Sequence, residues 1–226
     1  MEKENFVKAV RIISQKYYTK ERKASPFEIL VHGILSTRTK DTTTFPAQKR
    51  LLAIADTPEK IAKLPTKKIE HLIYPVGFFR VKAKLLKRAC KVLITEFNSN
   101  VPSNKKDLMK IPGVGEKVAS LVLEWGFNLP YIAVDTHVNR ISQRLGIVPV
   151  GTKPSKTEEV LESILDANLR ISTNYSFVKF GREICRPVSP KCGICPVYKY
   201  CGFKLKSKYA ERMLKMPQDK DINYAV

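Results

Sequence analysis

Apolar positions recur with the period of an α-helix along almost the whole chain. They predict an N-terminal helix carrying Phe6, Val10, Ile13 and Tyr17, and further helices over 25–35, 79–97, 135–145, 155–167 and 172–183. Shorter helices are expected after capping residues Asp41, Thr57, Thr66 and Ser103, with Pro46 marking a bend or the true start of the helix near Asp41. Residues 131–134 read as a strand but are too few to form a sheet, so the predicted fold class is all-α.

A Pro-Gly turn lies between two of the predicted helices, in the segment LMKIPGVGEK. Its glycines, Gly113 and Gly115, allow a positive φ and a close approach of the backbone at Val114. The apolar stripe that follows (Val118, Leu121, Val122 and Trp125) predicts a helix with one buried face. Unpaired N–H groups at the start of such a helix can hold a phosphate. An ordinary corner between two helices explains the same turn, because Pro-Gly turns are common.

Four cysteines lie close together near the C-terminus: Cys185, Cys192, Cys195 and Cys201, separated by six, two and five residues. In an intracellular chain, such a group binds metal far more often than it forms disulfides. Four thiolates suit either tetrahedral zinc or an iron–sulfur cluster. A single CxxC pair favours iron–sulfur, because zinc ribbons usually have two such pairs. The fifth cysteine, Cys90, falls in an amphipathic helix and is expected to be structural.

The charge balance favours a polyanionic partner. The chain has 226 residues, with 41 Lys and Arg against 21 Asp and Glu, and a formal net charge of +20. Nucleic acid is the favoured partner, although a merely lysine-rich surface gives the same count. No signal peptide or membrane-length apolar run is visible, so an intracellular protein without a membrane partner is expected. Arg186 and Lys191 lie between the first two cysteines and are candidates for phosphate contacts, the alternative being solvated surface charge.

Two segments, LMKIPGVGEK and YIAVDTHVNR, closely resemble the helix-hairpin-helix and Gly/Pro-Asp signature of the endonuclease III branch of DNA glycosylases. The resemblance extends from about residue 25 to residue 201. It implies two all-helical lobes with a DNA cleft between them, one over 24–130 and the other over 1–23 plus 131–204, followed by a basic tail at 205–226. It also implies a [4Fe–4S] cluster, because the family's cluster loop has the same cysteine spacing.

The resemblance gives roles to individual residues. Lys117 matches the lysine nucleophile of the bifunctional members, and Asp135 matches their catalytic carboxylate. Read alone, Lys117 is one of many surface lysines and Asp135 is a helix N-cap. Family DNA contacts map to the turn residues Gly113, Val114 and Gly115, and to Arg38, Phe78 and His137. Arg38 departs from the bacterial pattern, which has glutamine there, and Glu116 stands where many relatives carry a basic residue.

The function implied is that of a bifunctional DNA glycosylase with AP-lyase activity, excising oxidised pyrimidines in base excision repair. The expected partner is double-stranded DNA with damaged bases or abasic sites, bound by a monomer inside the cell. One alternative is a monofunctional mismatch or adenine glycosylase, although such enzymes usually lack a lysine at the position of Lys117. Others are a non-catalytic helix-hairpin-helix DNA-binding module and a zinc-stabilised nucleic-acid-binding protein.

Overall fold

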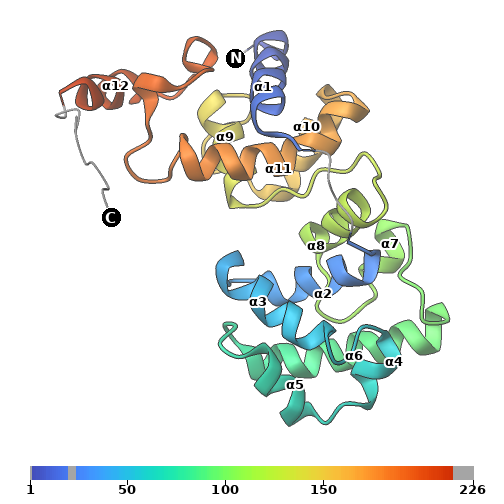
Figure 1. Ribbon diagram of the computed structural model, residues 1–226. Helices are drawn as coiled ribbons and strands as arrows, with labels where there is room; N and C mark the ends of the chain where they lie inside the picture. The colour runs from blue at the N-terminus through green and yellow to red at the C-terminus, as the bar shows by residue number, and fades with distance from the viewer. Residues whose placement is uncertain (1, 20–23, 216–226) are drawn as a thin grey trace. The chain divides into compact units, whose positions relative to one another are not determined.

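The computed structural model describes residues 2–19 and 24–215, which divide into two compact units. One unit is Lys20–Ala133 and the other combines Met1–Thr19 with Val134–Val226. Every regular element in the described residues is a helix, as the apolar periodicity predicts (Figure 1). The lobe boundaries expected from the resemblance, 24–130 and 1–23 with 131–204, stay a prediction.

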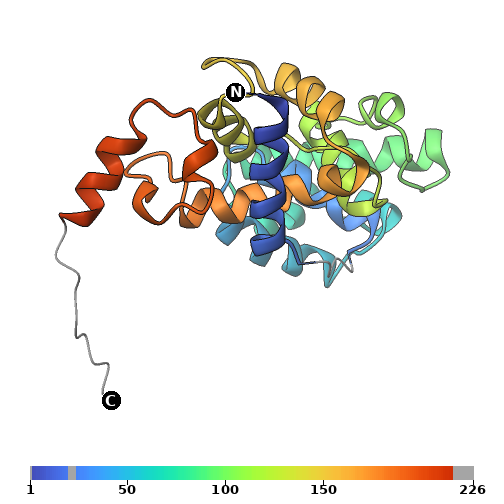
Figure 2. The same ribbon diagram turned by 90° about the horizontal axis from the view of Figure 1, so that it is seen from above.

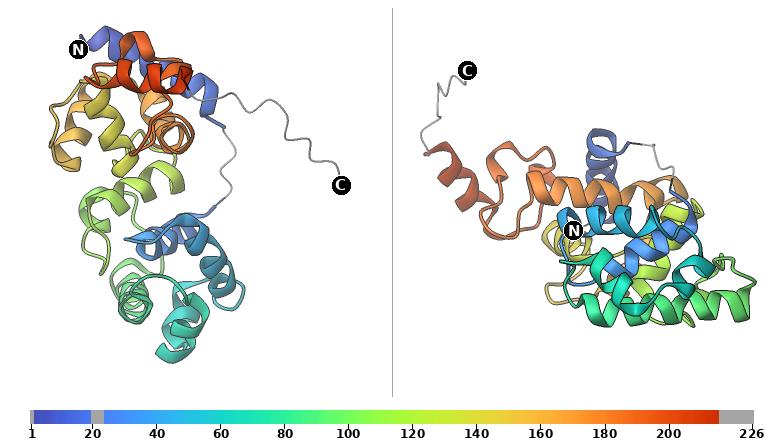
Figure 3. Two further views of the ribbon diagram at one scale, coloured as in Figure 1. Left: turned by 90° about the vertical axis from the view of Figure 1, so that its left-hand side faces the viewer. Right: turned by 60° about the horizontal axis from the view of Figure 1, so that its bottom comes forward.

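The unit Lys20–Ala133 is built around a single apolar core. Its helices are α2 (Pro26–Ser36), α3 (Asp41–Leu52), α4 (Pro58–Lys63), α5 (Thr66–Ile73), α6 (Phe79–Phe97), α7 (Lys105–Leu108) and α8 (Glu116–Leu121), and α8 continues into a π-helix, η1 (Val122–Gly126). Helix α6 packs along α4 and α5 (Figure 3). Helix α2 is the central element, because it contacts α3, α6, α8 and η1 and buries Leu30, Ile34 and Leu35 almost completely.

In the second unit, the N-terminal helix packs on a helix from the far end of the chain. Helix α1 (Lys3–Tyr17) lies against α11 (Ala167–Glu183), where Tyr17 and Phe180 meet with ring centroids 5.8 Å apart (Figures 1 and 2). Helix α9 (Thr136–Leu145) packs on α11, and α10 (Pro154–Ile164) packs on α9. After α11 come two 3-10 turns, η2 (Cys192–Ile194) and η3 (Tyr198–Tyr200), and then α12 (Lys206–Leu214), which contacts η2.

Several predicted helix ends are confirmed by their hydrogen bonds. Ser25 and Glu28 form the expected capping box of α2, Thr57 caps α4, and Asp135 caps α9. Helix α6 has the predicted bounds.

Other predicted ends are wrong because a neighbouring residue takes the capping position. Asn104, not Ser103, caps α7, and Pro65 precedes α5, so Thr66 is its first helical residue. Asp41 is likewise inside α3, which runs through Pro46 without starting there. Residues 131–134 form no strand, and part of the tail expected over 205–226 forms α12, while 216–226 lie outside the described residues.

None of the described helices combines the length and the hydropathy of a membrane span.

Candidate active site

The Pro-Gly turn leads from α7 into α8 through a tight hydrogen-bonded corner. The Val114 N–H donates to the Ile111 carbonyl at 3.0 Å, and Gly113 takes a φ of +88° that disfavours any residue with a Cβ. Gly115 has an extended backbone, so only Gly113 uses the positive φ that the sequence suggested for both glycines. A Cβ at Gly115 would meet no heavy atom within 4 Å, and both glycines are exposed. The Val114 side chain is buried, so this residue offers only its backbone to a ligand.

Lys117 is the second residue of α8 and is half-buried. Its neighbour Val118 packs into α2 at Gly33, where an added methyl group would lie only 2.6 Å from Val118 Cγ1. Gly33 therefore allows α8 to approach α2 as closely as it does. This contact fixes the first turn of α8 and, with it, the stem of Lys117.

Replacing Gly33 with alanine should destabilise the protein by about 1–3 kcal/mol, because the methyl group overlaps a buried, β-branched side chain that cannot rotate away. The overlap outweighs the gain of about 1 kcal/mol that alanine normally brings inside a helix. Thermal or urea unfolding measures the change. Gly115→Ala is the matched control, because its methyl group enters open space, and it should change the free energy of unfolding by about 0.5 kcal/mol or less. Equal free energies of unfolding for the two variants would contradict the close contact between Gly33 and Val118.

His32 links α2 to α3 through a buried polar chain. Its Nδ1 lies 3.0 Å from Gln48 Oε1, and the Gln48 amide nitrogen donates to the Glu28 carbonyl at 2.8 Å. Its Nε2 lies 3.8 Å from Asp41 Oδ1. Burial lowers the pKa of His32, while Gln48 and Asp41 act to raise it and the positive charge of Lys117 lowers it further. The positive charge of Lys117 therefore acts on His32, the buried histidine of this network.

Asp135 caps α9 with one of its two carboxylate oxygens. Oδ1 accepts hydrogen bonds from the backbone N–H groups of His137 at 2.8 Å and Val138 at 2.9 Å. Oδ2 takes no part in this cap, and the residue is half-buried. The helix therefore orients the carboxylate while one oxygen stays outside the capping hydrogen bonds.

His137 and Arg140, which follow Asp135 on α9, contact each other through their side chains. Arg140 Nη2 lies 3.1 Å from His137 Nδ1 and also donates to the Gly181 and Cys185 carbonyls. Burial lowers the pKa of Arg140, and the negative charges of Cys185 and Asp135 act in the opposite direction. A Cβ at Gly181 would meet the His137 ring at 2.6 Å, so the glycine makes room for it. The structure thus holds His137 within its own unit, and its contact with DNA stays a prediction.

The two remaining candidates of the first unit, Arg38 and Phe78, stand at the tips of neighbouring turns. Both are exposed, and both adopt a left-handed backbone, with φ of 52° and 58°. A left-handed conformation is costly for residues other than glycine and is kept only where the surroundings impose it. The turns touch, since a Cβ at Gly77 would lie 3.1 Å from Thr39 Oγ1 and 3.3 Å from the Arg38 carbonyl.

The four cysteines gather in the loop between α11 and α12. All are half-buried and none forms a disulfide. Burial raises the pKa of Cys195 to about 12, and the other three thiols add to the rise. Burial likewise raises the pKa of Cys192 and Cys201, and the charge of Cys185 adds to both rises.

Two basic side chains surround these thiols. Arg144 Nη1 lies 3.5 Å from Cys185 Sγ and donates to the Arg186 carbonyl at 2.6 Å, while Lys206 donates to the Cys201 carbonyl at 2.6 Å. Four thiolates with nearby cations suit an iron–sulfur cluster, whose thiolate ligands leave a net negative charge. Among the described residues no three His, Cys, Asp or Glu side chains converge on a single ion. A multi-iron cluster spreads its ligands more widely than one ion does. The donor set therefore fits the predicted cluster.

Arg186 and Lys191 lie on the same loop, Arg186 exposed and Lys191 half-buried. Arg186 Nε donates to the Arg182 carbonyl at 3.3 Å, which directs its stem back along α11. Sequence reasoning did not identify Arg140 and Arg144, which donate to carbonyl groups of the cysteine loop. Their spacing of four residues from each other on the helix after Asp135 was the available signal, because it places both on one face.

Comparison with known proteins finds two matching family models, one covering parts of both units and one covering the cysteine loop. Residues 31–167 match the model of the HhH-GPD superfamily of base excision DNA repair proteins, and residues 185–201 match the iron-sulfur binding domain of endonuclease III. Endonuclease III of Thermotoga maritima is 39% identical over 85% of this chain and 90% of its own length. Endonuclease III of Escherichia coli K12 is 32% identical over 81% of this chain and 86% of its own.

Solved structures agree in fold. A trapped endonuclease III–DNA covalent intermediate superimposes with a TM-score of 0.84 at 30% identity, covering 94% of this chain and 99% of its own. A non-covalent endonuclease III–DNA complex gives a TM-score of 0.85 at 31% identity, covering 95% of this chain and 100% of its own.

Proposed function

Because the chain belongs to the HhH-GPD superfamily of base excision DNA repair proteins, in its endonuclease III branch, we propose that it is a bifunctional DNA glycosylase and AP lyase. Its proposed substrates are oxidised pyrimidines in double-stranded DNA, together with abasic sites. The protein would act as a monomer on DNA inside the cell. The observation that carries the proposal is the position of Lys117, at the start of α8 directly after the Gly113–Gly115 turn and braced through Val118.

The proposed reaction begins with eversion of the damaged nucleotide, because its sugar carbon is inaccessible within the stacked duplex. The uncharged amine of Lys117 then attacks C1′. The C1′–Nζ bond forms as the bond from C1′ to the base breaks, and the base leaves with a proton. The sugar ring opens to give a Schiff base. Loss of a C2′ proton expels the 3′ phosphate and cuts the strand, and water finally releases the lysine.

Asp135 would act on the charge that develops during this reaction. The sugar becomes cationic as the base leaves, and a fixed carboxylate stabilises such a charge strongly where water is excluded. The same carboxylate can accept the proton that the attacking amine gives up. The proposal gives Lys117 and Asp135 roles in one reaction, as they have in the family. Support for this comes from the family match, which spans both residues.

The cluster loop would hold DNA without taking part in bond breaking. The cluster, when bound, supplies a rigid link among Cys185, Cys192, Cys195 and Cys201. Arg186 and Lys191 would then meet phosphates from a fixed loop. The backbone N–H groups of the Pro-Gly turn would hold a second stretch of phosphates. These contacts are independent of base sequence, as repair of scattered lesions requires.

Borohydride trapping tests the proposal. Borohydride reduces a Schiff base to a stable amine, so wild-type protein should form a covalent adduct with duplexes containing thymine glycol or an abasic site. Duplexes with an A:8-oxoguanine or G:T pair serve as comparisons. Excision without any adduct would favour a monofunctional glycosylase, and DNA binding with neither would favour a non-catalytic module.

A further inference from the structure

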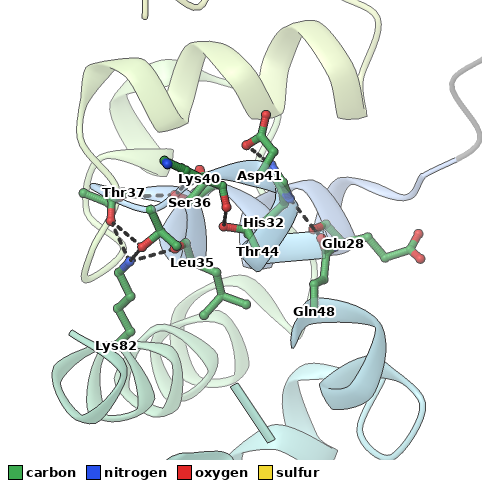
Figure 4. Close-up of polar contacts among 12 residues, drawn as sticks. Glu28, His32, Leu35, Ser36, Thr37, Lys40, Asp41, Thr44, Gln48 and Lys82 are labelled. Atoms are coloured by element: carbon green, nitrogen blue, oxygen red, sulfur yellow. Dashed lines mark hydrogen bonds and ion pairs between the residues drawn. The ribbon is translucent and has the colours of Figure 1, made fainter. Parts of the chain in front are cut away.

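Lys82 is the buried lysine that the proposed reaction leaves unused. It lies one turn into α6, is only 4% exposed, and points away from solvent into the end of α2. Its ammonium donates to the Leu35 carbonyl at 2.7 Å, to the Thr37 carbonyl at 2.6 Å and to Thr39 Oγ1 at 2.9 Å (Figure 4). An ammonium has three N–H donors, and here each has an acceptor. The burial cost is therefore matched by a complete set of hydrogen bonds.

The acceptors of Lys82 lie on both sides of Arg38. Thr37 precedes Arg38 and Thr39 follows it, so the ammonium spans the turn that carries this exposed side chain. Carbonyls at the C-terminal end of α2 carry partial negative charge and favour a cation there. Burial lowers the pKa of Lys82 to about 8.

The backbone of Lys82 is hydrogen-bonded to the other turn, which carries Phe78. Its N–H donates to the Phe78 carbonyl at 3.0 Å and closes the first turn of α6 directly after Phe78. One residue therefore contacts Phe78 through its main chain and both neighbours of Arg38 through its side chain. The close approach of Gly77 to Thr39 and Arg38 adds a second junction between the same turns.

We propose that Lys82 is a positioning residue that joins the Arg38 turn (residues 37–39) and the Phe78 turn (residues 76–78) into one rigid device for entering the duplex beside an everted nucleotide. The inference rests on the proposed function. Arg38 and Phe78, whose turns are linked by Lys82, would enter the base stack together. The planar ring of Phe78 would replace lost stacking, and Arg38 would reach toward the partner strand. Without the ammonium, the Arg38 turn would lose its hydrogen bonds to Lys82 at Thr37 and at Thr39.

The test is a double-variant cycle with excision measured in single turnover. Lys82→Met keeps an unbranched apolar stem and removes the three donors. It should slow excision of thymine glycol on the order of tenfold to a hundredfold, because misplacement by about 1 Å is enough to lose that much rate. In an Arg38→Ala, Phe78→Ala background the same change should lower the rate by about twofold or less, because coupled residues are not additive.

The controls separate positioning from a general loss of charge or fold. Lys91→Met removes a charge from the exposed side of α6 and should leave the rate within about twofold of wild type. Thr39→Val removes one of the three acceptors of Lys82, together with the hydrogen bond from Thr39 Oγ1 to the Thr37 carbonyl, and should show a smaller, parallel defect. It carries the test if Lys82→Met does not fold. Fluorescence of 2-aminopurine opposite the lesion should show slower opening in both variants.

Two outcomes would overturn the inference while leaving the proposed function intact. In one, wild type forms the borohydride adduct and Lys82→Met, or Thr39→Val in its place, excises at the wild-type rate. In the other, the full defect persists in the Arg38→Ala, Phe78→Ala background, so Lys82 does not act through those turns. If wild type forms no adduct on any substrate, the proposed lyase function itself fails.

Discussion

Lys117→Ala should abolish the borohydride-trapped adduct completely and lower excision of oxidised pyrimidines on the order of 10⁴-fold. The amine is the atom that bonds to C1′, and alanine offers no other nucleophile at this position. The fold should be retained, because Lys117 is half-buried and the contact that positions α8 is made by Val118 with Gly33. Gel detection of the adduct and single-turnover excision measure the two effects.

The control for Lys117→Ala is Lys110→Ala, which removes an exposed lysine near the same turn. The Lys110 ammonium pairs with Asp107 at 2.7 Å on the surface, and such a pair contributes only about 0–1 kcal/mol. Its adduct yield should match wild type. Full trapping by Lys117→Ala would assign the nucleophile to another lysine and refute the site described above.

The pKa of His32 offers an independent test that Lys117→Ala acts only locally. Burial is the main cause of the lowered pKa of His32, and the positive charge of Lys117 lowers it further, so removal of that charge should raise the pKa slightly. The chain has three histidines, which makes an NMR titration simple to assign. A charged His32 is disfavoured by burial in the folded state, so wild-type stability should fall as the pH drops below about 6.5. The variant should lose less stability over the same interval.

Local signals in the sequence were enough to predict much of the fold. The apolar period placed α6, and the Ser25 capping box placed the start of α2, because each depends on residues within a few positions. Predictions failed where neighbouring residues compete for one role, as Ser103 and Asn104 do for the cap of α7. The π-helix after α8 was also missed, since its wider turn breaks the regular period.

The candidate site was predictable only in part, because lysines look alike in sequence. Lys117 was identified by the family signature, whereas Lys82 resembles any surface lysine of a basic chain. The burial of Lys82 follows from partners 43 to 47 residues away in the chain, and helical periodicity carries no information about such contacts. The cysteines are the opposite case, because spacings of only a few residues predict their role as ligands.

The Asp135→Asn variant should lose excision about 10²–10³-fold while keeping its fold and most of its DNA affinity. Asparagine caps helices about as well as aspartate, so the hydrogen bonds to the His137 and Val138 N–H groups can persist. The variant therefore removes the negative charge and little else. Single-turnover excision, duplex binding and thermal unfolding should be measured on the same preparation.

Asp166→Asn provides the matched control for this charge. Asp166 caps α11 in the same unit, accepting from the Leu169 N–H at 2.9 Å, and it has no proposed role in the reaction. Both variants should unfold within about 1 kcal/mol of wild type, since each loses only a charge near a helix N-terminus. Only Asp135→Asn should lose excision. If it instead loses binding and excision equally, or unfolds well below Asp166→Asn, then Asp135 serves as a helix cap and the cationic sugar must be stabilised by another group.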